Sequence, residues 1–138
     1  MAEFILKAKV KAAGLEDRYY IESAAVSTEE IGNPVYPPAR RCLRQHGIPF
    51  DEYRTARQVR RADYAAFDRL ICMDGSNLRW LSRLIPEDTQ GKVKLMMRYA
   101  GSGRDVADPW YTGDFEQTYR DLDESCEAML AEDINTFD

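Results

Sequence analysis

The sequence predicts an α/β fold of three layers, in which a small parallel sheet is flanked by helices. Two short apolar runs, residues 69–73 and 93–97, have the length and the aliphatic content of buried strands. Helical patterns separate these runs, and strands that alternate with helices favour a parallel sheet whose active edge lies at the carboxyl ends of the strands. With 138 residues, 44% of them hydrophobic, the chain is long enough to bury a core, and we expect one domain over residues 1–138.

Start and stop signals divide the N-terminal half into short elements. Gly14 suits the end of an amphipathic helix that places Phe4 and Ile5 on one face. Pro37 suits the start of a second helix and Gly47 its end. The elements expected here are a helix at residues 1–13, a strand at 19–24, and helices at 39–46 and 60–67.

The C-terminal half carries the clearer helix signals. Leu78, Leu81 and Leu84 are spaced for burial on one helix face. Asp114 with Gln117 resembles a capping box, so the last helix is expected to begin at Asp114. Asp74 with Asn77 is expected to cap the start of the helix at residues 76–85. The helices expected here cover residues 76–85 and 114–131.

Composition narrows the class of partner. A formal net charge of −5 argues against a nucleic-acid binder, because an acidic surface repels phosphate backbones. No apolar run approaches the roughly 18 residues of a membrane span, and no signal peptide is recognised. The three cysteines form neither a CxxC pair nor a zinc pattern. We therefore expect a cytoplasmic protein with reduced thiols, no bound metal and no cofactor.

The most distinctive local feature is Asp108-Pro109-Trp110-Tyr111, a turn-prone segment with an acid beside two aromatic residues. Such a segment suits a general acid that protonates a phenolic leaving group. On composition alone, Asp-Pro is also an ordinary turn signal, and one of the aromatic side chains could simply pack on the last helix.

Seven segments together resemble the low-molecular-weight protein tyrosine phosphatase family, whose order and spacing they keep from Met1 to about Leu130. They are residues 22–34 (ESAAVSTEEIGNP), 46–49 (HGIP), 56–58 (ARQ), 67–68 (FD), 71–74 (ICMD), 76–79 (SNLR) and 108–111 (DPWY).

The resemblance implies a phosphotyrosine-phosphatase-I-like fold and the hydrolysis of aryl phosphate monoesters through a cysteinyl-phosphate. It implies that Asp108 is the general acid, and that it later activates the water that hydrolyses the intermediate. Trp110 and Tyr111 would flank the phenyl ring, while Glu29 and Glu30 would lie at the rim of the cleft. The implied partners are a phosphotyrosine protein or a small aryl phosphate, with no cofactor.

The nucleophile of that chemistry is not recognisable in these residues. The family begins with a strand that leads into a C-x5-R-S loop, whereas this sequence opens at Met-Ala-Glu. No cysteine has an arginine six residues later: Cys42 is followed at that distance by Ile48, Cys72 by Leu78 and Cys126 by Glu132. Cys72 lies in an apolar strand, where a cysteine is ordinarily a small core residue.

We therefore expect a chain that lacks the first strand and the phosphate loop, and that is inactive alone. The sequence leaves two origins open, a shortened phosphatase or a natural pseudophosphatase that acts as a binding or scaffold protein. A missing strand between residues 19–24 and 69–73 would also favour a dimer or strand exchange, because unpaired sheet edges readily pair with another chain.

Overall fold

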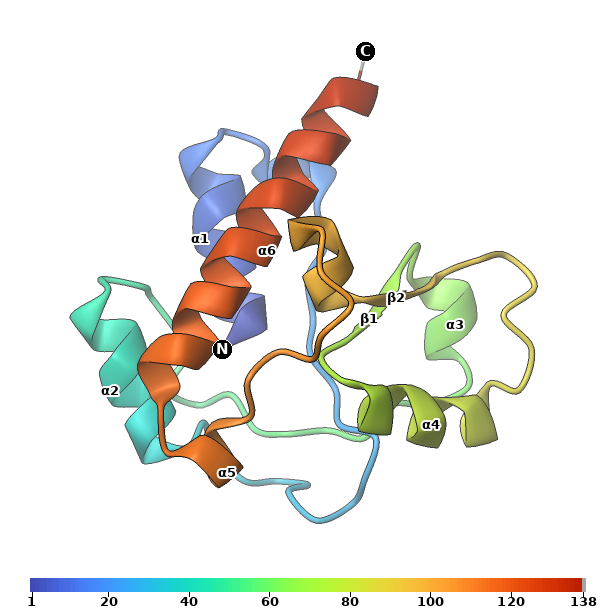
Figure 1. Cartoon of the computed structure of the whole chain (residues 1–138), viewed down its shortest axis with the longest axis horizontal. Coiled ribbons are helices and arrows are strands. Elements are labelled where there is room, and N and C mark those ends of the chain that lie inside the picture. The colour runs from blue at the N-terminus through green and yellow to red at the C-terminus, as the bar shows by residue number, and fades with distance from the viewer. Residues whose placement is uncertain (138) are drawn as a thin grey trace.

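The computed structural model describes residues 1–137, and it is an α/β domain built around one long C-terminal helix (Figure 1). The two strands pair in parallel, with Leu70 opposite Val93 and Cys72 opposite Leu95. In chain order the elements are α1 (Ala2–Ala12), η1 (Glu16–Arg18), α2 (Pro37–Gln45), α3 (Asp63–Ala66), β1 (Leu70–Cys72), α4 (Gly75–Leu84), β2 (Val93–Leu95), η2 (Met96–Ala100), α5 (Pro109–Thr112) and α6 (Phe115–Thr136).

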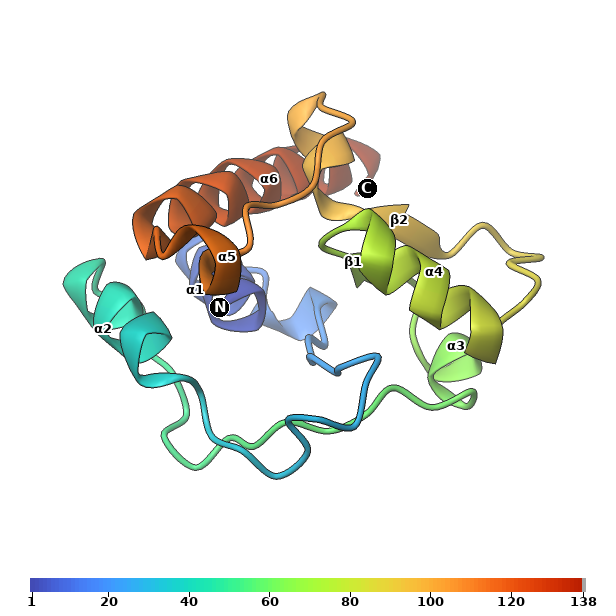
Figure 2. The same ribbon diagram turned by 60° about the horizontal axis from the view of Figure 1, so that its bottom comes forward.

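The small sheet separates two apolar clusters, which confirms the expected layering. Successive residues of a strand point to opposite faces. Accordingly, Ile71 packs on the larger cluster, formed by α1, α2, η2 and α6, whereas Cys72 belongs to a smaller cluster with Leu81 of α4. Figure 2 shows the two strands between α6 and α4.

Capping side chains explain where two of the helices begin. The Asp74 carboxylate accepts a hydrogen bond from the backbone N–H of Asn77 at 2.7 Å, as expected for the start of α4. The Asp114 carboxylate accepts from the backbone N–H of Gln117 at 2.9 Å at the start of α6. These side chains satisfy N–H groups that have no partner inside their own helix.

The predicted strand at residues 19–24 is wrong, because this segment enters no ladder within residues 1–137. Only the next residue, Ala25, forms an isolated parallel bridge, with Gln58. The backbone N–H of Ala25 donates to the Arg57 carbonyl, and the N–H of Val59 donates to the Ala25 carbonyl, both at 2.8 Å. A strand needs such partners along its whole length, which local sequence preference does not supply.

Other boundaries differ by less. The strand expected at 93–97 ends at Leu95, because Met96 and Met97 turn into η2, which ends at Gly101 with a φ of 77°. The helix expected at 60–67 is limited to α3, and the last helix runs five residues further than expected, to Thr136 rather than residue 131. Of the three leucines spaced for burial on α4, only Leu81 is fully buried.

Two further observations bear on the expected partners. Within residues 1–137, β1 pairs with β2 alone, so self-association through the other edge of β1 stays a prediction. No helix among these residues combines the length and the hydropathy that crossing a bilayer requires.

The core between α1 and α6 should dominate stability. Ile5 of α1 is fully buried, so replacing it with alanine leaves a cavity, and we expect Ile5→Ala to lower the free energy of unfolding by about 2–5 kcal/mol. Ile134→Ala is the matched control, because Ile134 is 46% exposed, and it should cost no more than about 0.5 kcal/mol. Urea denaturation measures both values, and equal losses would contradict this account of the core.

Candidate active site

Asp108 lies at the start of a short helix that follows the sheet. Its carboxylate accepts a hydrogen bond from the backbone N–H of Trp110 at 2.9 Å. Its carbonyl accepts from the N–H groups of Tyr111 and Thr112, both at 3.1 Å, which closes the single turn of α5. The expected acid is therefore the N-cap of α5, half-buried, with one carboxylate oxygen bonded to the backbone.

We call residues 104–112 the acid loop. Its first part, residues 104–107, is hydrogen-bonded both to the end of β1 and to α6. The backbone N–H of Val106 donates to the carbonyl of Met73, just beyond β1, at 2.9 Å. The carbonyl of Ala107 accepts from the Thr118 hydroxyl of α6 at 2.7 Å. These bonds place Asp108 at the carboxyl edge of the sheet, where the sequence predicted the active edge.

Asp121 of α6 is the strongest anchor of the acid loop. Its side chain is 1% exposed, and it accepts two hydrogen bonds from the Arg104 guanidinium at 2.6 and 2.9 Å. It also accepts from the N–H of Ala107 at 2.9 Å and from the Gln117 amide at 2.8 Å. The Arg104 guanidinium, followed by these other donors, lowers the pKa of Asp121 to about 2 despite its burial.

Sequence reasoning missed Asp121, although a signal was present. Asp121 precedes Leu122, and it lies three residues after Thr118 and four before Ser125, both of which are buried on the same face of α6. A carboxylate within the buried face of a helix requires a charged partner. That requirement predicts a cationic partner for Asp121, which the structure identifies as Arg104.

A cleft of about 380 Å³ lies between the start of α4 and the acid loop. The backbone N–H of Gly75 donates to the Asp105 carboxylate at 3.0 Å, which links the two sides of the cleft. The residues that line it are Asp74, Gly75, Ser76, Arg79, Asp105, Val106, Ala107, Asp108 and Tyr111. The expected acid and one of the two expected aromatic residues therefore border the same cleft.

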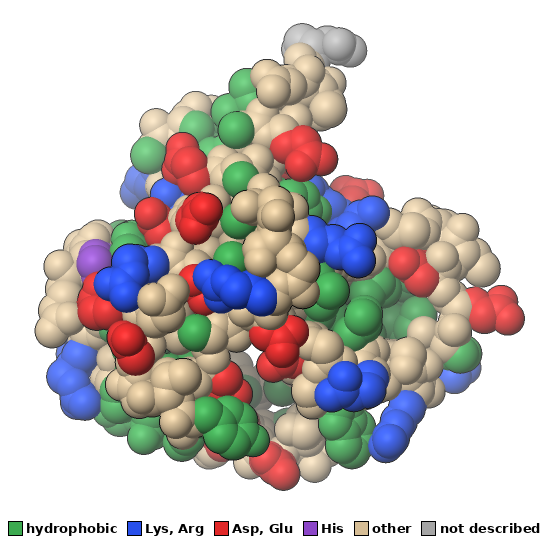
Figure 3. Space-filling model, in the orientation of Figure 1, with side chains coloured by type: hydrophobic (Ala, Val, Ile, Leu, Met, Phe, Trp, Pro, Cys, Tyr) green, Lys and Arg blue, Asp and Glu red, His purple; other side chains and the backbone are tan. Residues whose placement is uncertain are grey.

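Trp110, Tyr36 and Phe115 pack on one another, and we call these three side chains the aromatic wall. The rings of Trp110 and Tyr36 lie 4.3 Å apart, and Tyr36 is 6.0 Å from the ring of Phe115, the first residue of α6. Trp110 thus packs on Tyr36, which the sequence did not single out. Tyr111 is 91% exposed, and hydrophobic side chains reach the surface in the region of α5 (Figure 3).

Glu29 and Glu30 lie in an exposed turn. Glu30 accepts a hydrogen bond from the Asn33 amide at 2.7 Å. Neither glutamate lines the cleft, so their role at its rim stays a prediction.

All three cysteines are buried thiols. Burial raises the pKa of Cys42 and of Cys72 to about 11, and that of Cys126 to about 12. A nucleophilic cysteine requires the opposite, a pKa lowered by a cation or a helix N-terminus. Cys72 is a core residue, as expected.

Comparison with known proteins gives one consistent answer. A family profile described as "Low molecular weight phosphotyrosine protein phosphatase" matches residues 1–136. The rat protein of that name is 36% identical over 135 residues, which cover 94% of this chain and 84% of the relative. The Bacillus subtilis low molecular weight protein-tyrosine-phosphatase YfkJ is 35% identical over 133 residues, which cover 95% of this chain and 85% of the relative.

Solved structures agree with the sequence comparisons. The crystal structure of Bacillus subtilis YfkJ superimposes with a TM-score of 0.92 at 32% identity, covering 99% of this chain and 87% of that one. A drosophila arginine phosphatase superimposes with a TM-score of 0.83 at 29% identity, covering 95% of this chain and 87% of that one. The chain belongs to the low-molecular-weight phosphotyrosine protein phosphatase family.

The contacts of Asp121 predict a specific pH dependence of stability. A carboxyl whose pKa is lowered in the folded state stabilises the fold above its ordinary pKa of about 3.9, and this contribution is lost as the pH falls toward about 2. Asp121→Asn should therefore be less stable than the native chain at neutral pH, by on the order of 2 kcal/mol, and the difference should shrink below about pH 4.

Urea unfolding measured from neutral to acid pH checks this expectation. Asp123→Asn serves as the control. The Asp123 side chain is 45% exposed beside Lys9, so this substitution should change the pH dependence of stability little. A loss of stability in Asp121→Asn that stayed constant at every pH would show that the charge of Asp121 is not what holds the acid loop.

Proposed function

We propose that this protein takes part in the hydrolysis of aryl phosphate monoesters such as phosphotyrosine, with Asp108 as the general acid. The supporting observation is the position of its carboxylate, which borders the cleft beside Tyr111 and accepts a hydrogen bond from the backbone N–H of Trp110. Membership of a phosphotyrosine phosphatase family supports the same substrate class.

The chemistry proposed for Asp108 follows from the leaving group. A phenol has a pKa of about 10, so its oxygen departs poorly as an anion and benefits from protonation as the P–O bond breaks. Within residues 1–137, only one oxygen of the Asp108 carboxylate accepts a protein hydrogen bond. The other oxygen is available to carry the proton, and after its transfer the carboxylate can accept a proton from the attacking water.

Trp110 of the aromatic wall and the neighbouring Tyr111 are proposed to orient the phenyl ring. Trp110 is 64% exposed even though it packs on Tyr36, so one part of its indole remains open to a ligand. Tyr111 lies at the border of the cleft. Two aromatic side chains beside the acid would hold an aryl group by offset or edge-to-face contacts, each worth about 0.5–1.5 kcal/mol.

Residues 1–138 by themselves are proposed not to turn over substrate. The thiolate that attacks phosphorus requires a lowered pKa and a nearby arginine, whereas Cys42, Cys72 and Cys126 are buried with raised pKa values. None of them is followed by an arginine at the spacing of the family's loop.

An assay with p-nitrophenyl phosphate tests this directly. We expect residues 1–138 to hydrolyse the ester no faster than a buffer blank, and to give no phosphocysteine in mass spectrometry after acid quenching. Turnover, or a phosphate on any of the three cysteines, would refute the assignment. Binding of an aryl phosphonate without turnover would instead support a non-catalytic binding role for these residues.

The role of Asp108 is tested in a chain in which residues 1–138 follow a segment carrying a C-x5-R-S loop of the family type. There, Asp108→Asn should lower kcat for phenyl phosphate by about 100- to 10,000-fold, because an amide cannot protonate the leaving oxygen. The loss in kcat should be smaller for p-nitrophenyl phosphate, because nitrophenol is more acidic than phenol and its oxygen departs more readily without being protonated.

Asp105→Asn is the matched control, because Asp105 lies in the same cleft and its remaining carbonyl oxygen can still accept from Gly75. It should keep near-native kcat on both esters. Equal losses on both esters in Asp108→Asn would identify Asp108 as a positioning residue rather than the acid.

A further inference from the structure

A second cluster of reactive side chains lies outside the cleft, between α2 and the start of α6. Cys42 and His46 are four positions apart, so they lie on the same face of the chain at the end of α2. Glu116 reaches them from the first turn of α6. One ligand atom from each of the three side chains lies within 4.8 Å of the other two.

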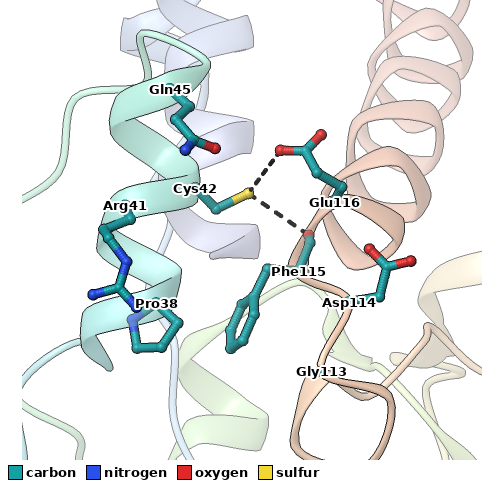
Figure 4. Close-up of a pocket in the computed structure, with 8 residues that line it drawn as sticks. All are labelled: Pro38, Arg41, Cys42, Gln45, Gly113, Asp114, Phe115 and Glu116. Carbon is teal, nitrogen blue, oxygen red and sulfur yellow. Dashed lines mark hydrogen bonds between the residues drawn. The ribbon is translucent and has the colours of Figure 1, made fainter.

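The individual contacts are close. The Nε2 atom of His46 is 2.8 and 2.9 Å from the two carboxylate oxygens of Glu116. The Cys42 sulfur lies 3.6 Å from a Glu116 oxygen and 3.6 Å from the Phe115 carbonyl oxygen. Figure 4 shows the Cys42 side chain pointing from α2 toward Glu116 and Phe115 across the pocket.

The two separations that involve Glu116 are close to those of a small tetrahedral ion, and the Cys42 sulfur and the His46 nitrogen lie within 4.8 Å of each other. In zinc sites the Zn–S distance is about 2.3 Å and the Zn–N and Zn–O distances are about 2.0–2.2 Å, which places sulfur and oxygen ligands about 3.6 Å apart and nitrogen and oxygen ligands about 3.3 Å apart. The sulfur–oxygen distance already has this value. The His46–Glu116 contact of 2.8 Å would have to open by about half an ångström, which a side-chain rotation supplies.

We propose that Cys42, His46 and Glu116 form a zinc-binding site that joins α2 to α6. One sulfur, one imidazole nitrogen and one carboxylate oxygen are a ligand set that favours Zn²⁺ over Mg²⁺ or Ca²⁺, which prefer oxygen alone. The fourth position is open to water.

The surroundings allow an ion to enter. A pocket of about 450 Å³ borders Cys42 and Glu116, so the buried sulfur is reached from this side. The charged residues that line it are Arg41, Asp114 and Glu116 (Figure 4). Arg41 extends along α2 away from the sulfur in this view, and the two carboxylates more than offset its charge.

The imidazole is also held in place by its other neighbours. The ring of His46 stacks on the ring of Tyr119 at a centroid distance of 3.6 Å and an interplanar angle of 9°. Such packing restricts the ring and lowers the entropy lost on binding an ion. When zinc binds, the Cys42 thiol releases its proton to solvent and the thiolate forms the Zn–S bond.

Zinc bound here would reinforce the contact between α2 and α6 beside the aromatic wall. Phe115, next to Glu116, lies 6.0 Å from the ring of Tyr36, and Tyr36 packs on Trp110. The site has three protein ligands, and none of them is among the residues that line the cleft.

Titration of the full chain with Zn²⁺ and with Co²⁺ tests the proposal. Calorimetry should show one Zn²⁺ per chain, and Co²⁺ should give the near-ultraviolet absorption of a cobalt–thiolate bond. His46→Gln should weaken binding at least 10- to 100-fold, the loss that even an outer partner of a ligand typically causes. Cys42→Ser should abolish the cobalt–thiolate absorption.

Two matched variants separate this site from unspecific binding. Glu124→Gln removes an exposed carboxylate of the same helix, and Cys72→Ser removes a thiol of the other apolar cluster; both should keep the stoichiometry and the cobalt spectrum. Far-ultraviolet circular dichroism establishes that each variant folds. Because His46 is exposed, His46→Gln is the ligand replacement that disturbs the fold least. Equal affinity in His46→Gln and the native chain, or no zinc uptake by the native chain, would contradict the proposal and leave only a hydrogen-bonded contact between His46 and Glu116 beside a thiol.

Discussion

The buried carboxylate of Asp121 is the constraint on which the active-site half of the molecule depends. A charge removed from water is costly unless it is paired, and Asp121 finds its partners in Arg104 and in the backbone of Ala107. Because both partners belong to the acid loop, the packing of α6 and the position of Asp108 are linked. The position of Asp108 is therefore fixed by the contacts of its loop with α6.

The first two turns of α6 serve both proposed sites. Asp121 holds the acid loop on one side of the helix, while Glu116 reaches His46 and Cys42 on α2. Phe115, the residue before Glu116, packs on Tyr36 of the aromatic wall. An ion bound at Glu116 would thus act about one helix turn before Asp121, which gives the proposed zinc site a physical connection to the acid loop.

Short-range features of the sequence predicted much of the structure. The caps at Asp74 and Asp114 were predicted correctly, since each depends on two residues that are three positions apart. Residues 19–24 failed as a strand because a ladder requires a neighbour far away in the chain. Tyr36 was missed for the same reason, because its partner Trp110 is remote in sequence.

Local chemistry alone therefore determined where most helices begin, which runs are apolar and which acid stands beside aromatic residues. Tertiary packing decided the rest: which thiols are buried, which carboxylate on α6 is charged in the interior, and which side chains meet across α2 and α6. The reason is that burial and pairing depend on residues such as Arg104 and Asp121, or Cys42 and Glu116. The sequence does not show that such distant residues meet; they do so only when the segments that carry them pack together.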